Sequence, residues 1–198
     1  RKTRFVDPAF TRKLFEVYSD REVELNDQQR AKFALALEEA VAANDVVVTL
    51  DFGHGLIGKQ EREILNRAKF LAVNAQTNTG NYGYNLITKY GRADYVCIDE
   101  PEARLATGMQ TERMPWVLKG LAHRRGGNEI IVTQGRNGCV SYAGGDPCDV
   151  PAFATNGVDT MGAGDAFMAA TAPLLAAGLE LEAAAFVGNV AGAIKVGI

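Results

Sequence analysis

Short apolar runs rich in β-branched residues alternate with longer amphipathic stretches along most of this chain. Residues 46–50, Val-Val-Val-Thr-Leu, form one such run, which predicts a strand buried on both faces. Asn26, followed three residues later by Gln29, is typical of a helix start, and Phe33 and Leu37 fall on one face of that helix. A helix followed by a buried strand is therefore the repeating unit that we expect.

The same alternation continues to the end of the chain. Further strands are predicted at residues 11–18, 70–74, 95–98, 129–133 and 139–143, and further helices at 61–69, 82–90, 102–106, 116–125, 164–177 and 181–195. This order predicts an α/β fold with a doubly wound, mostly parallel sheet and helices on both faces. Ligands of such sheets bind outside the carboxyl ends of the strands, and we expect the site there.

Composition narrows the class of partner. The chain has 198 residues and a formal net charge of −3 from 21 basic and 24 acidic side chains, which suits one domain or a large part of one. The absence of a basic tract argues against nucleic acid and against an anionic membrane as partners. No secretory signal or membrane-spanning run is visible, and the three cysteines lack metal-ligand spacing, so a cytoplasmic location with reduced thiols is expected.

A glycine-rich turn precedes the predicted helix at residues 164–177. Gly162, Ala163 and Gly164 present backbone N–H groups at a helix start, where unpaired donors and the helix dipole favour an anion such as phosphate. Asp165 on the first turn would be repelled by that anion, which makes it a candidate proton acceptor beside an attacking hydroxyl. The alternative is a tight turn in which Asp165 only complements the dipole.

A second acidic segment follows the predicted strand at residues 95–98. Carboxylates at Asp99 and Glu102 can hold Mg²⁺ through its water shell, and phosphoryl transfer needs such a metal together with anion-binding donors. The alternative is an acidic first helical turn, with Pro101 near the first helical position.

Residues 159–167, Asp-Thr-Met-Gly-Ala-Gly-Asp-Ala-Phe, resemble the C-terminal signature of the PfkB (ribokinase-like) carbohydrate kinases. The resemblance implies ATP-dependent phosphoryl transfer to a hydroxyl of a sugar or sugar phosphate, with ATP and Mg²⁺ as cofactors. It implies Asp165 as the catalytic base and the amides of Gly162, Ala163 and Gly164 as the anion hole. Thr160 is expected among the nucleotide contacts.

Residues 95–105 resemble the Asn-x-x-Glu region that the family associates with magnesium and phosphate. Glu102 matches the family glutamate and is expected to serve the metal. Asp99 stands where the family usually has asparagine, and we still expect it beside the nucleotide. Its extra negative charge is expected to weaken ATP binding unless a metal or a cation offsets it.

Two more segments resemble nucleotide-binding parts of the family. Thr133, Gly135 and Gly138 belong to a Gly-x-x-Gly loop that is expected to lie along the nucleotide, although a plain hairpin turn is the alternative. Asn189, in the small-residue helical segment 185–193, is expected beside the adenine. The alternative is that these small residues serve close helix packing.

The sugar side is represented by residues 51–55, which resemble an Asp-Tyr-x-Lys-Gly motif of the branch that phosphorylates heptose phosphates. Residues 1–4, Arg-Lys-Thr-Arg, also resemble that branch. Asp51 and His54 are therefore expected to contact the substrate. His54 replaces a lysine, so the fixed positive charge is missing, and a surface histidine is the alternative.

The family's N-terminal lid and its Gly-Gly-x-x-Asn sugar motif are not found here. We therefore expect residues 1–198 to be the C-terminal, nucleotide-binding portion of a larger kinase domain, cut at both ends. The resemblance also implies a possible fused nucleotidyltransferase domain and a homodimer. Two other hypotheses remain open: a nucleotide-binding or regulatory module that has lost catalysis, and an interaction domain without a nucleotide site.

Overall fold

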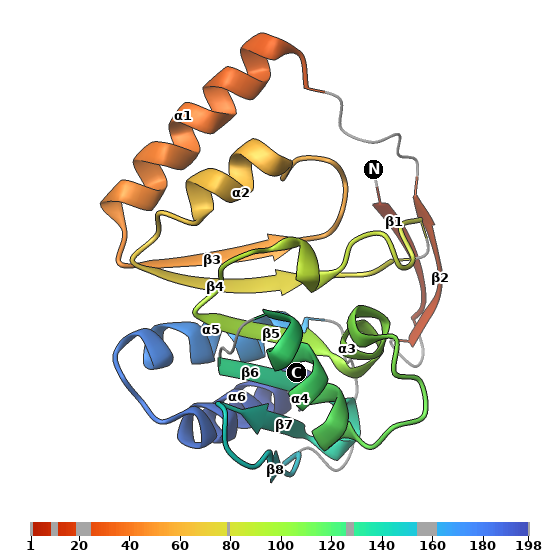
Figure 1. The fold of residues 1–198 in the computed structure, drawn as a ribbon. Helices are drawn as coiled ribbons and strands as arrows, with labels where there is room; N and C mark the ends of the chain where they lie inside the picture. The colour runs from red at the N-terminus through yellow and green to blue at the C-terminus, as the bar shows by residue number, and fades with distance from the viewer. Residues whose placement is uncertain are drawn as a thin grey trace.

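The computed structural model describes residues 2–8, 12–18, 25–78, 80–125, 129–153 and 162–197. Its centre is a sheet of six strands in the order β3-β4-β5-β6-β7-β8 (Figure 1). The strands are β3 (Val46–Asp51), β4 (Phe70–Ala75), β5 (Tyr95–Asp99), β6 (Glu129–Thr133), β7 (Cys139–Tyr142) and β8 (Cys148–Val150). Strands β3 to β6 are parallel to one another, and β7 pairs antiparallel with both β6 and β8. The predicted mostly parallel sheet is therefore confirmed.

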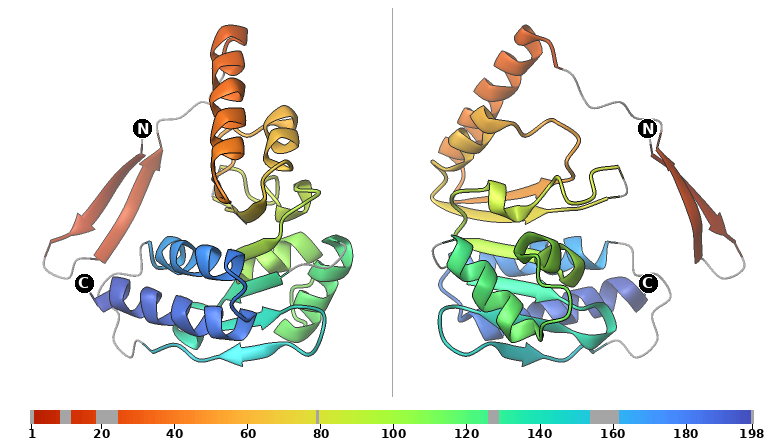
Figure 2. Two further views of the ribbon diagram at one scale, coloured as in Figure 1. Left: turned by 90° about the vertical axis from the view of Figure 1, so that its left-hand side faces the viewer. Right: turned by 45° about the vertical axis from the view of Figure 1, so that its right-hand side comes forward.

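Helices cover both faces of the sheet, as the alternation predicted (Figure 2). The helices α1 (Asp27–Ala43), α2 (Lys59–Leu65), α3 (Glu100–Thr107) and α4 (Met114–Arg125) supply residues to one apolar core. The helices α5 (Ala163–Ala176) and α6 (Leu181–Gly197) supply residues to the other. In the described part of the chain, no helix combines the length and the apolarity needed to cross a membrane.

The central strand β5 is apolar up to its last residue because both of its faces are buried. Val96 and Ile98 belong to the core under α3 and α4, whereas Tyr95 and Cys97 belong to the core under α5 and α6. All four side chains are buried, because successive residues of a strand point to opposite faces and both faces are covered. The hydroxyl of Tyr95 also forms a 2.9 Å hydrogen bond with that of Thr171, which ties the sheet to α5.

Three features differ from the sequence predictions. Residues 82–90 form turns and the short 3₁₀ helix η1 (Ile87–Lys89) instead of a regular helix, and Gly83 has a positive φ of 80° there. The three-residue strand β8 was not predicted, because so short a segment carries little periodicity. The predicted helix at 61–69 is the shorter α2, which begins at Lys59.

The strand predicted at residues 11–18 corresponds to β2 (Arg12–Tyr18), which pairs with β1 (Lys2–Asp7) in a separate antiparallel ribbon. Figure 2 shows this ribbon standing away from the central sheet. Phe5 and Phe15 stack at 4.5 Å between ring centroids, and both remain about half exposed.

Helices α5 and α6 approach closely at Gly188. A Cβ added there would lie 2.6 Å from the ring of Phe167, which is nearer than side chains tolerate. We expect Gly188→Ala to lower the free energy of unfolding by about 1–3 kcal/mol, because the packed ring and helix would have to move apart. Denaturant unfolding measures this change.

The matched control is Gly192→Ala in the same helix, where the nearest atom to an added Cβ is 3.7 Å away. Alanine favours a helix interior over glycine by about 0.8–1 kcal/mol, so this variant is expected to be neutral or stabilising. Equal effects of the two substitutions would contradict the close approach.

Candidate functional site

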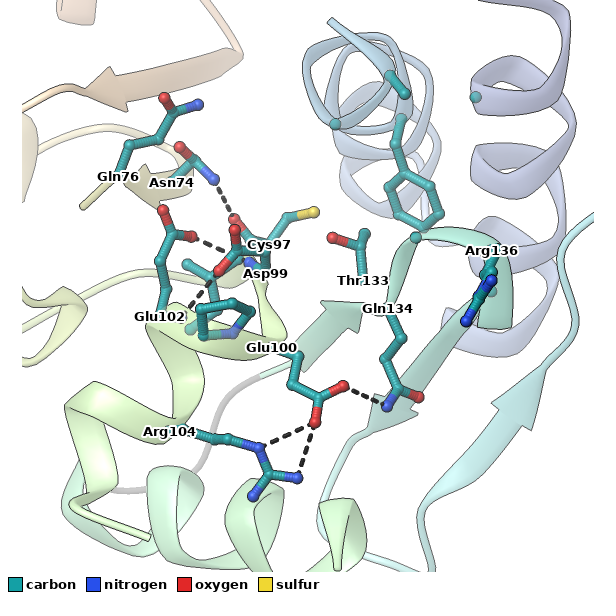
Figure 3. A pocket seen from close by; sticks show the side chains of 18 of the residues that line it. Asn74, Gln76, Cys97, Asp99, Glu100, Glu102, Arg104, Thr133, Gln134 and Arg136 are labelled. Atoms are coloured by element: carbon teal, nitrogen blue, oxygen red, sulfur yellow. Dashed lines mark hydrogen bonds and ion pairs between the residues drawn. The ribbon is translucent and has the colours of Figure 1, made fainter. Parts of the chain in front are cut away.

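A cavity of about 1170 Å³ opens at the carboxyl ends of β4, β5 and β6 (Figure 3). Parallel strands all end at the same edge of the sheet, so residues distant in sequence meet there. The predicted residues that line this cavity are Asp99, Glu102, Thr133, Gly135, Gly138, Ala163, Gly164 and Asn189. The structure therefore brings together eight of the thirteen residues singled out in the sequence.

The other five lie elsewhere or outside the described residues. Gly162, in a left-handed conformation with φ 77°, is the N-cap of α5, and Asp165 is an exposed residue of its first turn. Both adjoin Ala163 and Gly164 without lining the cavity themselves. Asp51 is the last residue of β3 and His54 lies in the turn after it; neither lines the cavity, and Thr160 lies outside the described residues.

Asp99 and Glu102 form a reciprocal cap at the start of α3. The Asp99 carboxylate accepts a 2.8 Å hydrogen bond from the Glu102 amide, and the Glu102 carboxylate accepts one of 3.0 Å from the Asp99 amide. Glu102 is only 8% exposed, whereas Asp99 faces solvent. Burial, followed by the nearby charge of Asp99, raises the pKa of Glu102 from 4.5 to about 7.

Asn74, which ends a predicted strand, and Thr77, which the sequence did not single out, add two oxygen atoms to this part of the cavity. Asn74 Oδ1 and Thr77 Oγ1 are buried and have no hydrogen-bond partner among the described residues, and both residues line the cavity. The Thr77 amide donates a 3.0 Å hydrogen bond to Glu102 Oε1. Buried polar atoms are normally paired, so these oxygens are available to a bound ligand, ion or water.

Glu100 connects two walls of the cavity. Its carboxylate accepts a 2.8 Å hydrogen bond from Gln134 and pairs with Arg104 at 2.7 Å (Figure 3). The hydrogen bond from Gln134, aided by the charge of Arg104, lowers the pKa of Glu100, so this side chain is an anion at neutral pH. Arg104 also donates hydrogen bonds to the backbone carbonyls of Gln110 and Glu112. Arg136, the other cation that lines the cavity, has no ion pair among the described residues.

The loop between β6 and β7 reaches the cavity through a backbone that only glycine allows. Gly138 has φ 89°, and a Cβ added there would lie 2.1 Å from the carbonyl oxygen of Val150. The Gln134 amide donates to the Gly138 carbonyl at 2.7 Å, which closes the loop on itself. Gly135 lies inside it with φ 56°.

The far end of the cavity is mostly apolar. Phe153, Ala193 and Val196 line it together with Asn189. The Asn189 side chain donates 3.0 Å hydrogen bonds to the carbonyls of Val150 and Pro151, so it holds α6 against the segment that follows β8. The side chains of Phe153, Ala193 and Val196 therefore give this part of the wall an apolar surface.

Asp51 is engaged within the protein. Its buried carboxylate pairs with Lys89 and accepts a 2.6 Å hydrogen bond from the Tyr90 hydroxyl. His54 is partly exposed in the turn that follows. Within the described ranges, no group of three or more His, Cys, Asp or Glu side chains is arranged to hold a metal ion.

Comparisons with known proteins identify the family. The family model for pfkB family carbohydrate kinases matches residues 13–197. Bifunctional protein HldE of Shewanella sp. (strain ANA-3) is 29% identical over 182 residues, which are 90% of this chain and 37% of that protein. Inositol 3-kinase of Zea mays is 39% identical over 103 residues, which are 50% of this chain and 27% of that protein.

Solved structures share the fold. Ribokinase from Thermotoga maritima superposes with a TM-score of 0.74 at 21% identity, covering 99% of this chain and 62% of that one. A mutant of phosphofructokinase-2 from Escherichia coli gives a TM-score of 0.77 at 14% identity, covering 98% and 64%. The chain thus spans well under half of the curated relatives and under two thirds of these structures. The family match over nearly the whole chain shows that it belongs to the pfkB family of carbohydrate kinases.

Proposed function

We propose that this chain carries the nucleotide side of an ATP-dependent kinase that phosphorylates a hydroxyl of a sugar or sugar phosphate. The observation that carries the proposal is the glycine turn at the start of α5, which adjoins a cavity at the carboxyl ends of the parallel strands. Family membership supports the class of reaction.

ATP is proposed to lie along the cavity with its base at the apolar end. Phe153, Asn189 and Val196 would surround the adenine, and the loop at Gly135 and Gly138 would follow the ribose and phosphates. Thr133, at the end of β6, is proposed as a further contact. The phosphates would then point toward the N-terminus of α5, where the backbone N–H groups and the helix dipole favour negative charge.

Asp165 is the proposed base. It would accept the proton of the sugar hydroxyl as the oxygen attacks the γ-phosphate, while the amides of Gly162, Ala163 and Gly164 stabilise the developing charge. Its exposure on the first turn of α5 leaves the carboxylate accessible to a substrate. Thr160, outside the described residues, stays a predicted nucleotide contact.

The residues around Glu102 fit a hydrated magnesium ion. Glu102 and Asp99 supply carboxylates, and the unpaired oxygens of Asn74 and Thr77 can accept hydrogen bonds from water in its shell. When bound, Mg²⁺ neutralises phosphate charge. The Asp99 carboxylate, unusual for the family, would be compensated by the same ion.

The sugar site is proposed to be completed by a further part of the protein, because the matched relatives are longer than this chain. His54 stays a prediction for the sugar side. The word bifunctional in the name of the HldE relatives supports the proposal of a fused second activity, here a nucleotidyltransferase. A homodimer is likewise proposed.

A second candidate function is a nucleotide-binding module without catalysis. It is favoured by Asp99, a carboxylate that lines the cavity where the family usually has asparagine. This candidate predicts that the full-length protein binds ATP–Mg²⁺ in calorimetry and shows no turnover across a panel of sugars. Turnover would exclude it.

Asp165→Asn tests the proposed base. In the full-length protein we expect kcat to fall by about 10²- to 10⁴-fold because the proton acceptor is lost, while ATP binding changes little. The matched control is Asp146→Asn, which removes a fully exposed carboxylate that pairs with Lys119. Wild-type phosphorylation rates in Asp165→Asn would contradict the assignment.

Glu102→Gln tests the buried acid. In the folded protein the pKa of Glu102 lies above its usual 4.5, so the folded state holds this proton more tightly than the unfolded state. The resulting stabilisation is present at acidic pH and is lost as the pH rises through about 7. Thermal unfolding between about pH 5.5 and 8.5 should therefore show the wild type losing stability relative to Glu102→Gln. Glu63→Gln, an exposed change in α2, should follow the wild type.

Arg136→Gln tests the lining cation. We expect ATP affinity to fall about fivefold, the equivalent of roughly 1 kcal/mol for an exposed ion pair, and the loss to shrink at high salt. Calorimetry measures both effects. Arg67→Gln, which breaks an exposed pair with Glu38 away from the cavity, is the control, and equal effects in the two variants would reject the role of Arg136.

A further inference from the structure

A buried ion pair joins the end of β3 to the segment between β4 and β5. Lys89 Nζ lies 2.5 Å from Asp51 Oδ2, and the side chain of Asp51 is 5% exposed. Burial acts to raise the pKa of Asp51, but Lys89, Tyr90 and the Gly53 amide together hold it below its usual value. The Asp51 carboxylate is therefore charged at neutral pH, and its partners lie within the protein.

Asn85 extends this pair toward the cavity. Its side-chain oxygen accepts a hydrogen bond from Lys89, and its side-chain nitrogen donates to the carbonyls of Asp51 at 2.8 Å and Gln76 at 2.9 Å. The Gln76 amide in turn donates to the Asp51 carbonyl at 2.8 Å. Asn85 is 3% exposed, so these bonds are shielded from water.

The next link is a single peptide group. The carbonyl of Gln76, which accepts from Asn85, and the amide of Thr77, which donates to Glu102 at 3.0 Å, belong to the same peptide plane. A peptide group is planar and resists twisting, so its two ends cannot turn independently. Asn85 on one side therefore sets the direction of the N–H that holds Glu102 on the other.

We propose that Asp51 and Lys89 are positioning residues, which act through Asn85 and the Gln76–Thr77 peptide to orient the Glu102 carboxylate toward a divalent cation. The divalent cation in this proposal rests on the proposed function, whereas the hydrogen bonds that hold Glu102 do not. It gives Asp51 a role other than the substrate contact expected from the sequence. Groups that orient metal-binding side chains commonly change metal affinity by about 10- to 100-fold when they are removed.

Lys89→Met is the main test, with two readouts. Amide exchange of Thr77 should become about tenfold faster or more, because the peptide is no longer held. In calorimetry with ADP, the gain in affinity on adding Mg²⁺ should fall by about tenfold, while binding in EDTA stays close to the wild type. The milder Tyr90→Phe, which removes one hydrogen bond to Asp51, should shift both readouts in the same direction and covers the case that Lys89→Met does not fold.

Tyr95→Phe is the matched control, because it removes a buried hydroxyl bond under α5, away from this segment. It should lower stability without changing Thr77 exchange or the magnesium effect. In a double-mutant cycle, Lys89→Met should add nothing to the loss of the magnesium effect in a Glu102→Gln background.

Additive losses in that cycle, or Thr77 exchange as slow in Lys89→Met as in Tyr95→Phe, would overturn the positioning role. If the wild-type chain binds no ADP with or without Mg²⁺, the proposed nucleotide site fails. Thr77 exchange then decides the positioning by itself, since it requires no ligand.

Discussion

Hydrogen bonding between four parallel strands determines where the strand-end residues of the candidate site lie. Strands β3 to β6 run in one direction and therefore end together, which places Asn74, Asp99 and Thr133 at one edge although they are far apart in sequence. This arrangement requires both faces of the sheet to be covered, and the two apolar cores meet that requirement. The polar site at the carboxyl ends of the strands thus depends on the apolar residues buried on both faces of the sheet.

The parts of the site that could be predicted are those encoded over short spans. The strand ends that carry Asp99 and Thr133 follow from apolar runs, just as the start of α1 at Asn26 follows from a spacing of three residues. What could not be predicted depends on partners far along the chain: Thr77 meets Glu102, and Gln134 meets Glu100. The predicted helix at residues 82–90 was wrong for the same kind of reason, because Lys89 and Tyr90 turn toward Asp51, which no local pattern reveals.

The cavity contains carboxylates, which repel an anionic ligand, and arginines, which attract it. Glu100 is balanced by Arg104 and held by Gln134, so it contributes shape more than net charge. Burial raises the pKa of Glu102 to about 7, so a protonated fraction at neutral pH reduces the repulsion that its carboxylate would otherwise exert. A divalent cation that displaced this proton would turn the same residue from a neutral wall into a ligand.

Asn189 has a consequence for how the sheet ends. Strand β8 is the last in the sheet and has only three residues, and an edge strand offers backbone groups to strands of other molecules. The two hydrogen bonds from Asn189 tie α6 to the Val150 and Pro151 carbonyls, where β8 ends. The opposite edge, β3, exposes Val48 and Leu50 by 42% and 38%. The Asn189 amide thus fixes the end of the short strand β8, whereas β3 presents apolar side chains at the opposite side of the described sheet.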